Sequence, residues 1–284
     1  MLGKRYSPYH TIMQRDPTSH KGENGKVAII GGSRTMHGAP LFSALAAEAS
    51  GVDLVYVCLP QCHAEVAKAT SLNVQIHAFA GDDLSPYDVV PILELLATMD
   101  SAVLGPGVAH GNARSITALM DIIAEAPCAL VLDAAALQPQ TLSLVKGNTV
   151  VVTPHMAELE RMGMAIDDCP DLAQEHGVTM ILKGPEDAVF GVDGSEVRLA
   201  GGNAGLTVGG TGDALAGLIA GLLAQGMEPF TATISAGMIL KRAAEKLLPD
   251  FGFAFGTRRV IGEIPSLLCG MGEESGMWKE ERGE

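Results

Sequence analysis

One glycine-rich stretch of the chain runs straight into an apolar segment: Asn203-Ala204-Gly205-Leu206-Thr207-Val208-Gly209-Gly210-Thr211-Gly212-Asp213-Ala214-Leu215. After Asp213, the residues from 214 to 224 are small or apolar, which predicts that the helix over 213–224 is buried inside a layered domain. The N–H groups at the start of such a helix need partners, and the glycines at 209, 210 and 212 allow the backbone to approach a ligand closely. The stretch therefore predicts a site that holds an anion, such as a phosphate, at a helix N-terminus.

A carboxylate at an anion site needs an explanation, because Asp213 would repel the ligand. The simplest function is that of a general base, which takes a proton from a substrate hydroxyl while the N–H groups stabilise a transferring phosphoryl group. The alternative is structural: Asp213 caps the helix, and the glycines serve tight packing. Other phosphate motifs fit less well, since no G-x-x-x-x-G-K-[ST] is present and residues 105–110 lack the third glycine of the dinucleotide fingerprint.

The composition limits the classes of function. A chain of 284 residues with 47% hydrophobic content and no evident linker predicts a single domain over residues 1–284. The net charge of -14 argues against nucleic acid and anionic membranes as partners. Five widely spaced cysteines indicate reduced thiols. Because the chain shows neither a signal-peptide core nor an apolar run of about 18 residues, we expect a cytoplasmic protein.

Short apolar strands alternate with helical segments along most of the chain. Strands are predicted at 27–30, 54–58, 74–78, 102–104, 129–132, 150–152 and 180–182, with a hairpin over 188–199 around Asp193-Gly194. Helices are predicted at 41–49, 63–69, 89–98, 115–124, 157–162, 213–224, 231–246 and 261–268. This alternation predicts a three-layer α/β/α doubly wound fold with a mainly parallel sheet. Residues 1–25 are expected to form an N-terminal extension, and residues 270–284 a frayed tail.

Polar and turn residues follow five of the predicted strands. They are Gly31-Gly32-Ser33, Gly105-Pro106-Gly107, Asp133, Thr153-Pro154-His155 and Lys183-Gly184-Pro185. Each has an ordinary structural explanation when taken alone, such as a turn, a cap or a solvated charge. Because ligands of doubly wound sheets bind at the carboxyl ends of the strands, their shared position indicates a site.

The ordered set of motifs resembles the ADP-dependent NAD(P)H-hydrate dehydratases, in their form as a stand-alone dehydratase domain. The resemblance covers roughly residues 15–225 and rests on the segments above together with Gly38-Ala39-Pro40, Glu158 and Asp187. The GGTGD segment alone is shared with other ribokinase-like kinases, whereas the whole set is more specific. The resemblance implies the ribokinase-like fold and the repair of hydrated nicotinamide cofactors.

In the reaction that the resemblance implies, ADP phosphorylates the ring hydroxyl of (6S)-hydrated NADH or NADPH (NADHX or NADPHX), and loss of phosphate restores the cofactor. Asp213 would be the base. Contacts with ADP and its phosphates are implied for Lys183, Gly184, Asp187, Asn203, Gly209, Gly210, Thr211 and Gly212. Contacts with the hydrated cofactor are implied for Ala39, Gly105, Gly107, His155 and Asp213, with small residues where a large planar ligand meets backbone. Mg²⁺ is expected with the phosphates, and Glu158 or Asp133 are candidate water-mediated ligands.

The chain departs from the family pattern in places. The turn Asp133-Ala134-Ala135 lacks the second carboxylate of the usual Asp-Ala-Asp, Met36 and His37 replace a common aromatic residue, and residues 251–284 match poorly and are expected to be peripheral. Two other functions stay open. One is an ATP-dependent kinase for a thiazole or pyrimidine vitamin precursor, which would use the same glycines and the same base. The other is a non-catalytic nucleotide-binding protein. A homo-oligomer, such as the tetramers common in the family, is also expected.

Overall fold

A nine-stranded sheet forms the centre of the computed structural model, which describes residues 15–145 and 147–277. The strand order is β3-β2-β1-β4-β5-β6-β7-β8-β9. Strands β1 to β7 pair in parallel, and β8 and β9 add an antiparallel hairpin at one edge. The bounds are β1 (Lys26–Ile30), β2 (Leu54–Leu59), β3 (Val74–Ala78), β4 (Ser101–Leu104), β5 (Ala129–Leu132), β6 (Val150–Val152), β7 (Thr179–Leu182), β8 (Asp187–Phe190) and β9 (Glu196–Leu199). The predicted α/β class, its parallel sheet and its hairpin are confirmed.

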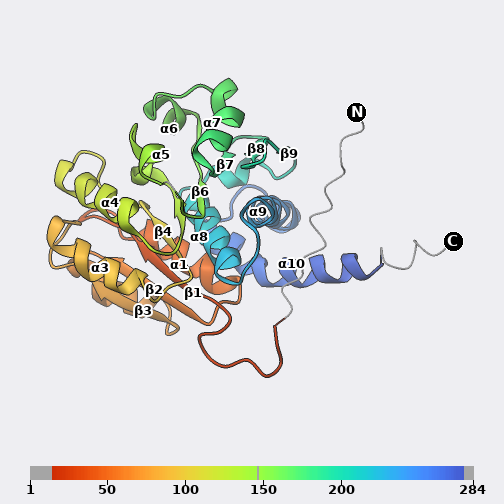
Figure 1. Cartoon of the computed structure of the whole chain (residues 1–284). Coiled ribbons are helices and arrows are strands. Elements are labelled where there is room, and N and C mark those ends of the chain that lie inside the picture. The colour runs from red at the N-terminus through yellow and green to blue at the C-terminus, as the bar shows by residue number, and fades with distance from the viewer. Residues whose placement is uncertain (1–14, 146, 278–284) are drawn as a thin grey trace.

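Helices cover both faces of the sheet, which explains why the strands read as unbroken apolar runs (Figure 1). Alternate residues of β1 enter two different cores: Val27 and Ile29 face one, and Ala28 and Ile30 face the other. The first face carries α1 (Gly38–Ala49), α2 (Ala64–Thr70), α8 (Thr211–Ala224), α9 (Pro229–Phe251) and α10 (Thr257–Met277). The second carries α3 (Val89–Leu96), α4 (Ala113–Glu125), α5 (Thr141–Leu144), α6 (Met156–Arg161) and α7 (Cys169–His176). Short 3₁₀ turns are η2 (Gln61–His63), η3 (Pro86–Asp88), η4 (Ala134–Ala136), η5 (Ile166–Asp168) and η6 (Ala204–Thr207).

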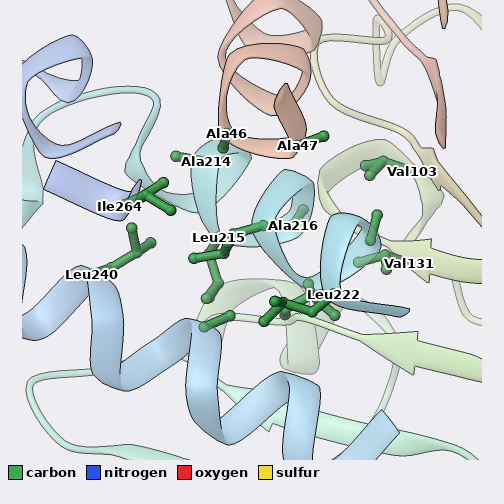
Figure 2. Packing of buried hydrophobic residues seen from close by; sticks show 14 of the residues in the cluster. Ala46, Ala47, Val103, Val131, Ala214, Leu215, Ala216, Leu222, Leu240 and Ile264 are labelled. Atoms are coloured by element: carbon green, nitrogen blue, oxygen red, sulfur yellow. The ribbon is translucent and has the colours of Figure 1, made fainter. Parts of the chain in front are cut away.

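Helix α8, which follows the glycine-rich stretch, is buried along most of its length. Every residue from Ala214 to Leu223 is buried. Figure 2 shows what surrounds this helix: Ala46 and Ala47 of α1, Val103 of β4, Val131 of β5, Leu240 of α9 and Ile264 of α10. The prediction of a buried helix is therefore confirmed, and its apolar composition follows from contact with protein on all sides.

Two glycines let α8 lie directly against the backbone of α1. A Cβ atom at Gly217 would lie 2.0 Å from the carbonyl oxygen of Ser43, and one at Gly221 would lie 2.1 Å from the Ser50 hydroxyl. The Ser43 hydroxyl also donates a hydrogen bond of 2.9 Å to the carbonyl oxygen of Asp213. This close packing fixes where the N-terminus of α8 lies relative to α1.

We expect Gly217→Ala to lower the free energy of unfolding by about 2 kcal/mol, because overpacking against a backbone carbonyl outweighs the better helix propensity of alanine. Urea denaturation measures the change. The matched control is Gly262→Ala within α10, where an added Cβ meets nothing within 4 Å, so that this variant should be as stable as the wild type or slightly more stable. Equal stability of the two variants would contradict the packing argument.

The structure also corrects several expectations. Helix α10 continues to Met277, beyond the helix predicted over 261–268, so residues 270–277 of the expected frayed tail are helical in the structure; residues 278–284 lie outside the described residues. Extending a helix that is already packed costs less than starting one, which explains how a glycine-rich segment can stay helical. Helices α5 and α7 were not predicted because both are short, and α7 is polar on average. Residues 1–14 of the predicted N-terminal extension are likewise not described.

The structure pairs none of the five cysteines with another: Cys58, Cys128 and Cys169 are buried, and Cys62 and Cys269 are exposed. Among the described residues, none of the helices combines the length and the apolar character needed to cross a bilayer.

Candidate active site

The turns after β1 and β4 meet at the point where the strand order changes direction, which is where doubly wound sheets bind ligands. The N–H group of Gly32 donates a hydrogen bond of 2.7 Å to the carbonyl of Pro106. A Cβ atom on Gly107 would lie 3.2 Å from the Cβ of Ala39 at the start of α1. The structure thus brings together Ala39, Gly105 and Gly107, which the resemblance assigned to one ligand.

The reason for glycine at position 105 differs from the expected one. Gly105 has a φ of 111°, and a Cβ atom there would lie 2.1 Å from the carbonyl oxygen of Asp133. The absence of a side chain is therefore required by the neighbouring turn of the protein itself, and a planar ligand is not needed to explain it.

A buried charged cluster joins the ends of β5, β6 and β7. The Lys183 ammonium lies 2.7 Å from Asp133 Oδ1 and 3.5 Å from Glu158 Oε2. The Thr153 hydroxyl donates a second hydrogen bond of 2.7 Å to Asp133 Oδ1. Although burial opposes the charge on Lys183, Asp133 and Glu158 raise the pKa of the ammonium, so it stays charged at neutral pH. This cluster places a fixed cation beside the N-terminus of α8, since a Cβ atom on Gly212 would lie 3.4 Å from Lys183 Nζ.

His155 begins helix α6 with a capping box. Its Nδ1 accepts a hydrogen bond of 3.2 Å from the N–H group of Glu158, and the Glu158 carboxylate accepts one of 2.8 Å from the N–H group of His155. The three-residue spacing of the two side chains therefore has a structural basis. The His155 ring is half exposed and faces the cavity described below, so the cap also holds an imidazole at the site.

The glycine-rich stretch presents unpaired N–H groups. Gly210, with a φ of 101°, is the N-cap residue of α8 and supplies no side chain to the helix end. Within the described residues, no hydrogen-bond acceptor meets the N–H groups of 210–213. The structural alternative, in which Asp213 caps the helix, does not hold, because Gly210 is the N-cap residue, the helix has no side-chain cap, and Asp213 lies in the first turn of α8. The N-terminus of α8 is thus available to an anion.

Asp213 has a pKa suited to proton transfer at neutral pH. Burial raises the pKa of its carboxyl to about 7, with repulsion from Asp133 and Glu158 adding to the effect and the Lys183 ammonium opposing it. A general base works best when its pKa lies near the working pH. Strongly perturbed carboxyl groups beside a cavity are typical of functional sites.

A cavity of about 830 Å³ opens between the glycine-rich stretch, the β7–β8 turn and α9. This volume is within the usual range for small-molecule sites. Of the residues predicted to bind ADP, six line it: Lys183, Gly184, Asp187, Asn203, Thr211 and Gly212. Gly209 and Gly210 lie beside it on the loop but are not among the lining residues, and neither is Asp213.

Sequence reasoning missed the apolar wall of the cavity, which consists of Leu206, Leu215, Gly237 and Leu240. It also missed Lys241, whose ammonium lies 3.2 Å from Asp187 Oδ2 and donates a hydrogen bond of 3.1 Å to the carbonyl of Pro185. A lysine that follows the apolar run Ile239-Leu240 within a helix was the available signal. The Asp187 carboxylate also accepts a hydrogen bond of 2.9 Å from the N–H group of Gly184, so it shapes the β7–β8 turn.

Three observations bear on a metal site. No group of three or more His, Cys, Asp or Glu side chains within the described residues could hold a metal ion. Asp133 and Glu158 are both engaged by Lys183. Ala135, where the family usually has a second carboxylate, is fully buried in the core beneath α3 to α7 and does not line the cavity. Its substitution therefore removes no carboxylate from the cavity lining.

Comparison with known proteins places these features in a family. The sequence model of a family described as NAD(P)H-hydrate dehydratase matches residues 27–266, so the expectation that the similarity fades near residue 225 is wrong. The ADP-dependent (S)-NAD(P)H-hydrate dehydratase of Cenarchaeum symbiosum is 34% identical over 90% of this chain and 93% of its own length. The fold is shared with a ribokinase-like superfamily protein from Enterococcus faecalis (24% identity, TM-score 0.80, 93% of both chains covered). It is also shared with the ADP/ATP-dependent NAD(P)H-hydrate dehydratase of Bacillus subtilis (22% identity, TM-score 0.78, 93% of this chain and 96% of that one). The chain belongs to the NAD(P)H-hydrate dehydratase family.

Proposed function

We propose that the protein converts (6S)-hydrated NADH or NADPH back to the intact cofactor at the expense of ADP. The observation that carries this proposal is the combination of a carboxylate of pKa about 7 with unpaired helix N-terminal N–H groups beside a cavity of about 830 Å³. Family membership supplies the substrate class, since the relative from Cenarchaeum symbiosum is named as an ADP-dependent dehydratase of this hydrate. A hydro-lyase reaction driven by cleavage of the phosphoanhydride bond of ADP fits both the geometry of the site and the family membership.

Asp213 takes the proton from the hydroxyl on the nicotinamide ring, and the freed oxygen attacks the terminal phosphoryl group of ADP, with AMP as leaving group. The N–H groups of Gly210, Thr211 and Gly212 and the Lys183 ammonium stabilise the charge that builds on that phosphoryl group. The ring C–O bond then breaks with phosphate as leaving group, and loss of a proton from the adjacent ring carbon restores the double bond. Water is thereby removed in two steps, each with a good leaving group.

The proposed ligands occupy two sides of Asp213. ADP lies in the cavity, against Lys183, Gly184, Asp187, Asn203, Thr211 and Gly212, with its phosphates toward Gly209 and Gly210 on the adjoining loop. The hydrated cofactor lies toward Ala39, Gly105 and Gly107 and reaches His155 at the wall of the cavity. A short path of contacts supports this placement, because the Ser43 hydroxyl lies 3.4 Å from the carbonyl oxygen of Ala39 and 2.9 Å from that of Asp213.

Mg²⁺ accompanies ADP in this proposal. With no three-ligand group among the described side chains, the phosphates and water would supply most of its ligands, and Glu158 or Asp133, both paired with Lys183, would contact it only through water. A cytoplasmic homo-oligomer completes the proposal, and the acidic net charge of -14 supports leaving nucleic acid and anionic membranes out of it.

The test is the absorbance at 340 nm of hydrated NADH mixed with purified protein and Mg²⁺, with ADP in one cuvette and ATP in another. Recovery of the NADH band with ADP supports the reaction and its donor together. Recovery only with ATP keeps the reaction and refutes the donor. No recovery with either nucleotide refutes the dehydratase and favours a kinase of the same fold or a binding protein.

We expect Gly212→Ala to weaken ADP binding about 10-fold by calorimetry, because the new methyl group would lie between the N-terminus of α8 and Lys183, where the phosphates are placed. The melting temperature should change little, since no protein atom lies closer than 3.4 Å to the added carbon. Gly111→Ala is the control, because an added Cβ there also meets open space and lies outside the cavity lining. Equal ADP affinity of Gly212→Ala and the wild type would refute the phosphate placement.

A further inference from the structure

The segment that connects α9 to α10 lies against the glycine-rich stretch, although no sequence pattern connects the two. The Thr257 hydroxyl, at the first residue of α10, donates a hydrogen bond of 2.8 Å to the carbonyl oxygen of Gly209. Thr257 is only 2% exposed. The ring of Phe255 packs against Gly205 so closely that a Cβ atom there would lie 2.1 Å from the ring. The expectation that residues 251–284 are peripheral is wrong for these two residues.

The bond from Thr257 fixes more than one carbonyl group. A peptide unit is planar and trans, so the C=O of Gly209 and the N–H of Gly210 point in opposite directions. With the oxygen held on the side of α10, the N–H of Gly210 is directed away from α10. That N–H group is one of those without an acceptor within the described residues. The orientation of an anion-binding donor is therefore set by a side chain on a different helix.

The peptide between Gly209 and Gly210 needs a hydrogen bond such as that from Thr257 to keep its orientation. Glycine on both sides leaves a peptide plane free to rotate at little steric cost, and Gly209 has no protein atom within 4 Å of a hypothetical Cβ. The other hydrogen bonds of the stretch hold other groups: the Thr211 hydroxyl binds the carbonyl of Leu206, and the Asn203 amide binds the carbonyl of Ala244. Among the described residues, Thr257 alone holds the carbonyl of Gly209 by a hydrogen bond.

We propose that Thr257 is a positioning residue for phosphoryl transfer: its hydroxyl holds the Gly209–Gly210 peptide so that the Gly210 N–H faces the transferring phosphoryl group. The inference rests on the proposed function and deepens it, because it assigns the geometry of the anion site to α10. Thr257 itself touches no reacting atom in this proposal. Its effect is carried by the peptide that it orients.

The test compares Thr257→Val with Thr257→Ser and with Thr233→Val. Valine has nearly the shape of threonine but cannot donate, whereas serine keeps the hydroxyl. Thr233 is the matched control, because it is fully buried in α9 and donates a hydrogen bond of 2.8 Å to the carbonyl of Pro229, away from the cavity lining. Thermal unfolding, calorimetry with ADP and turnover of hydrated NADH are measured on all of them, and on Thr257→Ala in case valine prevents folding.

We expect Thr257→Val to lower kcat and ADP affinity on the order of 10-fold, a part of what removal of a whole anion-hole donor costs. Its melting temperature should fall no more than that of Thr233→Val, and Thr257→Ser should restore both kcat and affinity. Wild-type kcat and ADP affinity in Thr257→Val, or in Thr257→Ala where valine prevents folding, would overturn the proposal, as would failure of serine to rescue. If the wild type binds ADP but does not dehydrate the hydrate, the proposed function fails, and the ADP affinities still decide the role of Thr257. A wild type that does not bind ADP overturns both.

Discussion

Asp213→Asn is expected to lower the turnover of hydrated NADH at least 100-fold, the usual scale of the contribution of a general base. The amide has the shape of the carboxylate but cannot take up the proton. The carboxylate does not cap α8, and burial and neighbouring charges, not hydrogen bonds, set its pKa, so the fold should tolerate the amide. ADP should bind at least as tightly, since a negative charge beside its phosphates is removed. Steady-state absorbance at 340 nm and calorimetry with ADP measure the two quantities.

The role of Asp213 as general base also determines how kcat/KM and stability change with pH. The pKa of Asp213 is raised from 3.8 to about 7, so kcat/KM of the wild type should rise with pH up to about 7 as the carboxylate ionises. The folded protein then binds more protons than the unfolded chain between about pH 4 and 7, so ionisation of Asp213 costs stability as the pH rises through this window. Asp213→Asn should therefore be at least as stable as the wild type at pH 8. Near wild-type turnover in Asp213→Asn would show that another group is the base. The same rise of kcat/KM with pH in the residual activity of the variant would show this too.

Much of the fold could be predicted because its strands are covered on both faces. Burial on both sides leaves an unbroken apolar run, as in Val150–Val152 and Ala129–Leu132, and such runs mark their own ends. Helix α7 gives no comparable signal, because it is short, polar on average and buries only Cys169 and Ala173. Tertiary packing, which a local pattern does not contain, decides such segments.

The site residues also fall into two groups, those that the sequence could predict and those that it could not. Residues directly after a strand, such as Lys183 and His155, could be predicted because the topology of a parallel sheet brings strand ends together. Leu240 and Lys241 lie in the middle of α9, where the apolar pattern is explained equally well by the core. Their place at the cavity depends on how α9 packs, and so does the contact of Thr257 with the glycine-rich stretch.

Sequence alone also could not separate glycines that face a ligand from glycines that face the protein. Gly105 and Gly217 are fixed by carbonyl groups about 2 Å from where a Cβ atom would lie. Gly209 has open space around it, and Gly212 is approached only by the Lys183 ammonium. Only Gly209 and Gly212 have room for a phosphate. A substitution at Gly212 is therefore expected to affect ADP binding, whereas one at Gly217 is expected to affect stability.

Lys183→Met is expected to lower the free energy of unfolding by about 3 kcal/mol, because it leaves the buried Asp133 carboxylate with no cation and with Thr153 as its remaining hydrogen-bond partner. Glu158 loses the same cation but keeps its hydrogen bond from the His155 N–H group and the arginine at 3.9 Å. Turnover should fall as well, since the cation beside the N-terminus of α8 is lost. The pKa of Asp213 should rise further, because the Lys183 ammonium lowers it in the wild type. The rise of kcat/KM with pH should therefore move to higher pH in the variant. Urea denaturation and the pH profile of kcat/KM measure these changes.

The double variant Lys183→Met with Asp133→Asn separates the two roles of the lysine. Removing the buried charge together with its partner avoids an uncompensated carboxylate, so much of the lost stability should return. Turnover should stay low, because the Lys183 cation beside the N-terminus of α8 is still missing. If the double variant regained both stability and turnover, Lys183 would serve only to neutralise Asp133, and the charge on the phosphoryl group would have to be stabilised without it.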